Sequence, residues 1–76
     1  MIPDVNRKEW KDLIQGRISH KCSSFSLQMK INSLNMSYRT NHMSLDEAVR
    51  DLHSMCWKYE KMYQKDIEQI FNLKTA

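Results

Sequence analysis

Two pairs of side chains that can bind a metal lie far apart in the chain. One residue separates His20 from Cys22, and two residues separate His53 from Cys56, so that the second pair lies one turn apart on a helix. Two imidazoles and two thiols form a chemically sensible zinc set. However, the first spacing is shorter than a usual zinc knuckle, and Cys56 falls within an apolar helical pattern where a buried thiol acts as a small hydrophobe. The sequence therefore predicts no metal ion and no cofactor.

The same residues offer little for catalysis. Cys22 is the better candidate nucleophile, because Lys21 and His20 stand beside it and would lower the pKa of its thiol. Proximity in the sequence alone does not show that His20 is positioned as a general base for Cys22. A chain of 76 residues with a single glycine also has little room for a pocket or for a phosphate-binding loop. We therefore expect no enzymatic activity and no catalytic residue.

Composition predicts one small helical domain that spans residues 1–76. The chain contains 41% hydrophobic residues, one glycine and one proline, which argues against a fold rich in loops or strands. Its first ten residues, MIPDVNRKEW, carry charges where a secretory signal needs an apolar core, and no window approaches the length of a membrane span. We expect a cytoplasmic protein whose two cysteines are reduced, with no membrane partner.

Residues 44–73 show the clearest helical periodicity in the chain. Ser44 and Glu47 are spaced as a capping box, and no proline or glycine interrupts the run that follows. An unbroken helix of this length would measure about 43 Å at about 1.5 Å per residue. A compact chain of this size is only about 30 Å across. The sequence therefore predicts a long C-terminal helix that projects beyond its own domain.

The far half of that helix would expose an apolar and aromatic stripe to water. Such a stripe needs either other segments of the chain or another protein to cover it. We therefore expect it to bind a protein partner or a second copy of the chain. The predicted interface residues are Leu52, Met55, Tyr59, Met62, Tyr63, Asp66, Ile67, Ile70 and Phe71.

Asp66 is the one charged residue in this apolar stripe. A carboxylate there must lie at the rim of the protein, pair with a cation or fix the register of packing. We expect a lysine or an arginine of a neighbouring helix to be its partner. On this interpretation, replacing Asp66 with leucine would raise thermal stability and loosen the specificity of association.

Two shorter segments precede the long helix. The first is predicted as a helix over 7–15, with Asn6 as its cap and Gly16 as its end. Residues 25–39 fit a central helix with two opposite apolar stripes, one containing Leu27, Ile31, Leu34 and Tyr38 and the other Phe25, Met29 and Met36. The same residues also alternate as in a β-hairpin with a turn at Asn32 and Ser33. We favour the helix.

The predicted fold is therefore all-α, with a short, a medium and a long C-terminal helix completed by self-association. The alternative is an α+β fold with a hairpin at residues 25–39.

The predicted function is a non-enzymatic protein–protein interaction module, such as an adaptor, an inhibitor or a small accessory subunit. The alternative is a small nucleic-acid-binding regulator, because residues 1–43 carry seven Lys or Arg against three Asp or Glu.

Overall fold

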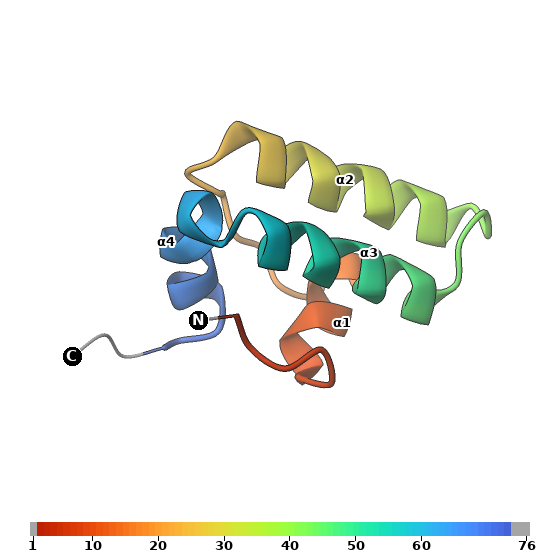
Figure 1. Cartoon of the computed structure of the whole chain (residues 1–76). Coiled ribbons are helices and arrows are strands. Elements are labelled where there is room, and N and C mark those ends of the chain that lie inside the picture. The colour runs from red at the N-terminus through yellow and green to blue at the C-terminus, as the bar shows by residue number, and fades with distance from the viewer. Residues whose placement is uncertain (1, 74–76) are drawn as a thin grey trace.

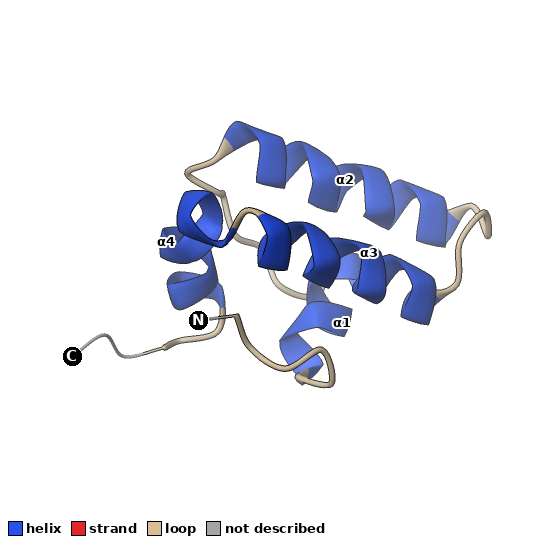
Figure 2. Ribbon diagram, in the orientation of Figure 1, coloured by secondary structure: helices blue, strands red, loops and turns tan. Residues whose placement is uncertain are grey.

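All regular secondary structure in the described part of the chain is helical, as the composition predicts. The computed structural model describes residues 2–73, and within this range it contains four helices and no strand (Figure 1, Figure 2). The all-α class is confirmed, whereas the three-helix arrangement and the hairpin at residues 25–39 are wrong. The helices are α1 (Lys8–Gln15), α2 (Phe25–Arg39), α3 (Leu45–Lys58) and α4 (Glu60–Ile70).

The first helix, α1, ends as predicted but begins differently. Gly16 ends it with a φ of 76°, a left-handed conformation that glycine adopts at no steric cost. Arg7 rather than Asn6 is the N-cap residue, and no side chain caps the helix. Instead, the Arg7 N–H donates to the carbonyl oxygen of Asp4 at 3.0 Å, and the Trp10 indole N–H donates to the same oxygen at 2.9 Å. The segment before α1 is therefore held by Trp10.

The two helices α2 and α3 lie side by side in opposite directions, and α1 packs against both (Figure 1). Asn41, with a φ of 62°, lies in the short link between them. The predicted capping box at the start of α3 is confirmed. Ser44 Oγ accepts a hydrogen bond from the Glu47 N–H at 3.1 Å, and the Glu47 carboxylate accepts one from the Ser44 N–H at 3.3 Å.

The long C-terminal helix predicted over residues 44–73 is wrong, because the backbone breaks at Tyr59. This residue has a φ of −116° and a ψ of 42°, outside the helical region, and stands between α3 and α4. After the break, α4 leaves the line of α3 and lies at the end of the molecule where α2 begins (Figure 1). The two halves of the predicted helix are therefore separate elements.

Burial of the aromatic stripe explains why the chain bends without a proline or a glycine. Tyr63, Ile67 and Phe71 are only 2%, 1% and 2% exposed, and the Phe71 ring lies 4.7 Å from the Trp10 ring between centroids. Burying three large side chains stabilises the fold by about 5–9 kcal/mol, at about 1.5–3 kcal/mol each. Interrupting the helix costs only a few hydrogen bonds of about 0.5–1.5 kcal/mol each. The bent arrangement is therefore favoured.

The chain covers Tyr63, Ile67 and Phe71 of the stripe that the sequence predicts to be exposed, but leaves Tyr59 and Met62 exposed. Its radius of gyration is 11.5 Å, close to the value of about 11 Å expected for a compact chain of this length. The predicted helix that projects beyond its own domain is therefore not present in the described part of the chain. Among the described residues, no helix is long and apolar enough to cross a bilayer.

Candidate functional site

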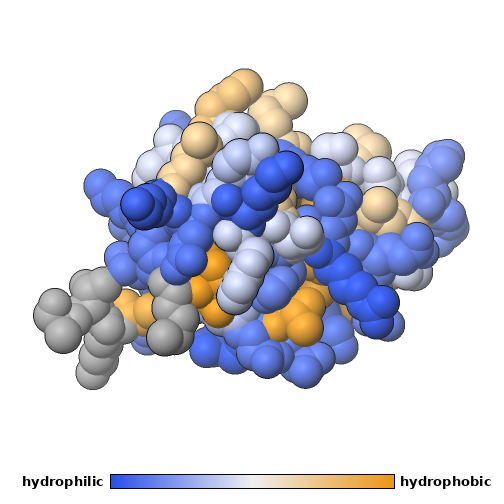
Figure 3. Space-filling model, viewed as in Figure 1, coloured by the Kyte–Doolittle hydropathy of each residue, from blue (hydrophilic) through white to orange (hydrophobic). Residues whose placement is uncertain are grey.

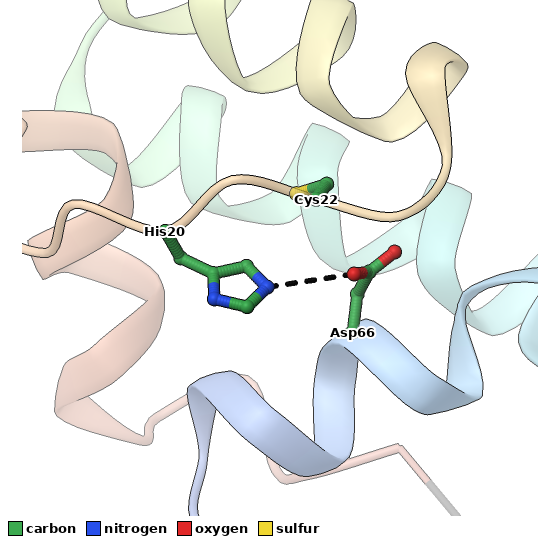
Figure 4. Close-up of side chains that lie close together, drawn as sticks. All are labelled: His20, Cys22 and Asp66. Atoms are coloured by element: carbon green, nitrogen blue, oxygen red, sulfur yellow. Dashed lines mark hydrogen bonds and ion pairs between the residues drawn. The ribbon is translucent and has the colours of Figure 1, made fainter.

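Asp66 is the buried carboxylate that ties α4 to the loop between α1 and α2. Its side chain is 1% exposed. One carboxylate oxygen accepts a hydrogen bond from the Ser23 N–H at 2.7 Å, and the other accepts one from the Ser24 N–H at 3.1 Å. His20 Nε2 lies 3.4 Å from Asp66 Oδ1 (Figure 4). Because Ser24 is the N-cap residue of α2, these contacts connect α4 to the start of α2.

The partner of Asp66 is not the predicted lysine or arginine. Within residues 2–73, the only basic side chain within ion-pairing distance of Asp66 is that of His20, which carries a charge only when it is protonated. Burial raises the pKa of Asp66, but hydrogen bonds from the backbone of Ser23 and Ser24 and from His20 favour the charged form more strongly. The net result is a pKa below the ordinary value. Asp66 is therefore a charged group that backbone N–H groups stabilise.

Both cysteines are buried free thiols. Burial raises the pKa of Cys22 to about 11, and the charge of Asp66 adds to this effect. Burial raises the pKa of Cys56 to about 12. The predicted lowering of the Cys22 pKa by Lys21 and His20 is therefore wrong. Neither thiol is activated as a nucleophile, because the reactive thiolate is scarce at neutral pH.

The structure brings together a set of potential metal ligands that differs from the set suggested by the sequence. The ligand atoms of His20, Cys22 and Asp66 all lie within 4.8 Å of one another. His53 is occupied elsewhere, since its Nε2 lies 3.1 Å from the Pro3 carbonyl oxygen and its ring packs edge-on against Trp10. Asp66 lies 46 positions from His20, and its unusual place in an apolar stripe is the only sequence signal for its role.

The nine predicted interface residues occupy three environments. Tyr59 and Met62 are exposed, at 44% and 58%, while Met55 and Ile70 are half-buried. The other five are in the interior of the chain, where they contact its own core rather than solvent. These interior residues are Leu52, Tyr63, Asp66, Ile67 and Phe71.

An uncovered apolar surface lies instead on α2. Its inner stripe is buried at Leu27, Ile31 and Leu34, as predicted. The opposite stripe is exposed, with Phe25 at 77% and Met36 at 60%, so the prediction of a central helix covered on both sides is wrong. Figure 3 shows hydrophobic side chains along this edge of the molecule. We call the exposed positions from Phe25 to Met36 the outer face of α2: Phe25, Ser26, Met29, Asn32, Ser33 and Met36.

A shallow groove adjoins this face at the break between α3 and α4. It has a volume of about 490 Å³, and its apolar lining consists of Trp57, Tyr59 and Met62. The groove and the outer face of α2 meet where Met62 Sδ accepts a hydrogen bond from Ser26 Oγ at 3.9 Å. Met62, one of the predicted interface residues, therefore borders the exposed surface of α2, and Tyr59 lines the same groove.

The basic first half of the chain is partly neutralised by ion pairs. Arg7 pairs with Glu9 at 2.8 Å, Lys8 lies 3.9 Å from Asp12, and Lys30 pairs with Asp51 at 3.1 Å. Three of its seven cations are therefore held by carboxylates, which weakens the positive surface available to a nucleic acid.

Comparison with known proteins gives no relative from which to transfer a function. No protein-family model matches this chain, and neither a curated protein nor a solved structure matches it significantly.

Proposed function

We propose that this protein is a non-enzymatic protein–protein interaction module whose docking surface is the outer face of α2. The observation that carries the proposal is the exposure of Phe25, Met29 and Met36, at 77%, 51% and 60%, in one row along a well-formed helix. Single apolar residues on a surface are ordinary, but three large apolar side chains along one side of a helix, here interrupted by Asn32 and Ser33, are typical of a binding site. A role as an adaptor or a small accessory subunit fits such a surface.

The occupant that fits this face best is a second copy of the chain. Every exposed position of α2 from Phe25 to Met36 is uncharged, so two copies can approach without like-charge repulsion. Phe25 and Met36 lie at opposite ends of the row, with Met29 near its middle. In an antiparallel pair of α2 helices, Phe25 of each copy would pack against Met36 of the other. The face is thus complementary to itself.

Sedimentation equilibrium over micromolar to submillimolar concentrations tests this proposal. We expect the native chain to form a dimer and Met29→Asp to be monomeric, because two aspartates would meet near the twofold axis. Ser54→Asp is the matched control, since it adds the same charge at an exposed helical position of α3 and should leave the dimer intact.

Two results would overturn the proposal. One is a native chain that remains monomeric throughout this concentration range. The other is a dimer that Met29→Asp and Ser54→Asp weaken equally, which would place the interface away from α2. Circular dichroism of both variants would establish that each is folded.

A further inference from the structure

We propose that His20, Cys22 and Asp66 form a binding site for one zinc ion. The three side chains converge from two distant parts of the chain, the loop before α2 and the second turn of α4 (Figure 4). Asp66 and Cys22 are 1% and 9% exposed, whereas His20 retains access to solvent. The cluster is therefore enclosed on one side and open on the other, as entry of an ion requires.

Distances within the cluster suit a shared ion. His20 Nε2 and Asp66 Oδ1 are 3.4 Å apart, which is long for an N–H···O hydrogen bond. Two nitrogen or oxygen ligands of one tetrahedral zinc lie about 3.3 Å apart, because each bond is about 2.0–2.1 Å long. The Cys22 sulfur lies within 4.8 Å of a ring nitrogen of His20 and of a carboxylate oxygen of Asp66, and binding of an ion would draw these ligand atoms closer together.

The hydrogen bonds around Asp66 leave it able to bind an ion. A carboxylate has about four lone-pair sites; the N–H groups of Ser23 and Ser24 take one on each oxygen, and the Ser23 hydroxyl takes a third, which leaves about one for an ion. These N–H groups also fix the orientation of the carboxylate, as partners outside the coordination sphere commonly do in metal sites. His20 would then bind the ion instead of contacting the carboxylate directly.

The chemical types of the three ligands favour zinc over the hard cations Mg²⁺ and Ca²⁺. One thiolate, one imidazole and one carboxylate suit a borderline-soft ion, whereas Mg²⁺ and Ca²⁺ prefer oxygen ligands alone. Binding exchanges the S–H bond of Cys22 for a sulfur–zinc bond and releases one proton to solvent. Three protein ligands leave the fourth position to water. This set replaces the one considered in the sequence, because His53 is engaged with Pro3.

Zinc content and cobalt substitution test the site. Protein purified without chelator should contain one zinc per chain, and Co²⁺ added to the metal-free protein should give the charge-transfer absorption of a thiolate ligand. Both signals should be lost in His20→Gln and in Cys22→Ser. His53→Gln and His42→Gln are the controls, because both histidines lie outside the cluster, and both variants should keep full occupancy.

The melting temperature gives a second readout, since an ion that binds only the folded state raises it. Zinc should raise the melting temperature of the native chain and of His42→Gln, but not that of Cys22→Ser. Folded native protein with no zinc and no thiolate–cobalt absorption would overturn the proposal. So would zinc that persists in both His20→Gln and Cys22→Ser but is lost in His53→Gln.

Discussion

The two halves of the predicted C-terminal helix differ in what determines their positions. The first half, α3, begins with a complete capping box between Ser44 and Glu47. The second half, α4, begins at Glu60, and its N-cap residue Tyr59 makes no side-chain cap. Its place is set by contacts with Trp10 and with the loop at Ser23 and Ser24. Local signals therefore define α3, whereas distant contacts define α4.

Truncation of the α4 core should give the largest effect. We expect Phe71→Ala to lower the free energy of unfolding by about 3–5 kcal/mol, because it leaves a cavity beside Trp10. Leu52→Ala in α3 serves as the comparison, with an expected loss of about 2–5 kcal/mol. Urea denaturation measures both. A loss below about 1 kcal/mol for Phe71→Ala alone would mean that α4 is not packed on the core.

Removal of the Asp66 carboxylate should come next. Asp66→Ala leaves two backbone N–H groups without their acceptor, and we expect a loss of about 2–3 kcal/mol in urea denaturation. Asp66→Leu should also lower the melting temperature, contrary to the expectation from the sequence, because leucine cannot accept these hydrogen bonds. A melting temperature above that of the native chain would show that the contacts to Ser23 and Ser24 contribute little.

Loss of the α3 cap should have a moderate effect. Ser44→Ala removes the acceptor for the Glu47 N–H and should lower the free energy of unfolding by about 1 kcal/mol. Thermal or urea denaturation measures this loss, and Ser54→Ala is a control at an exposed position within the same helix. Equal stability of the two variants would argue that α3, like α4, depends on distant contacts alone.

A change on the outer face of α2 should have the smallest effect on the stability of a single chain. Met36 is 60% exposed, so Met36→Ser should change the free energy of unfolding by no more than about 0.5 kcal/mol. The measurement is urea denaturation at a concentration low enough to keep the chain monomeric. A loss above about 2 kcal/mol would show that Met36 packs within its own chain.

Sequence periodicity predicts which segments are helical and identifies both apolar stripes of α2, but not that only one of them is buried. Leu27, Ile31 and Leu34 follow from spacing alone, and so do Gly16 as a helix end and Ser44 as a cap. The break at Tyr59 was not predictable in this way, because nothing in residues 44–73 disfavours a helix locally. It results from the burial of Tyr63, Ile67 and Phe71 against distant parts of the chain, which only the packed fold shows.

The two candidate sites also differ in whether neighbouring or distant residues form them. The exposed stripe of Phe25, Met29 and Met36 is visible in the sequence as the second apolar side of α2. The cluster of His20, Cys22 and Asp66 is not visible in the sequence, because Asp66 lies in α4, far along the chain from the loop that contains the other two. An interior carboxylate in an apolar pattern is a signal that some distant group must stabilise it, but it does not identify that group.

Proton–proton contacts between the rings of Trp10 and Phe71 provide the most direct test of this fold. Their centroids are 4.7 Å apart, so nuclear Overhauser spectra should contain strong cross-peaks between the two side chains. The same spectra should show an interruption of helical contacts at Tyr59. Continuous helical contacts from Leu45 to Ile70, with no cross-peak between Trp10 and Phe71, would contradict the bend between α3 and α4.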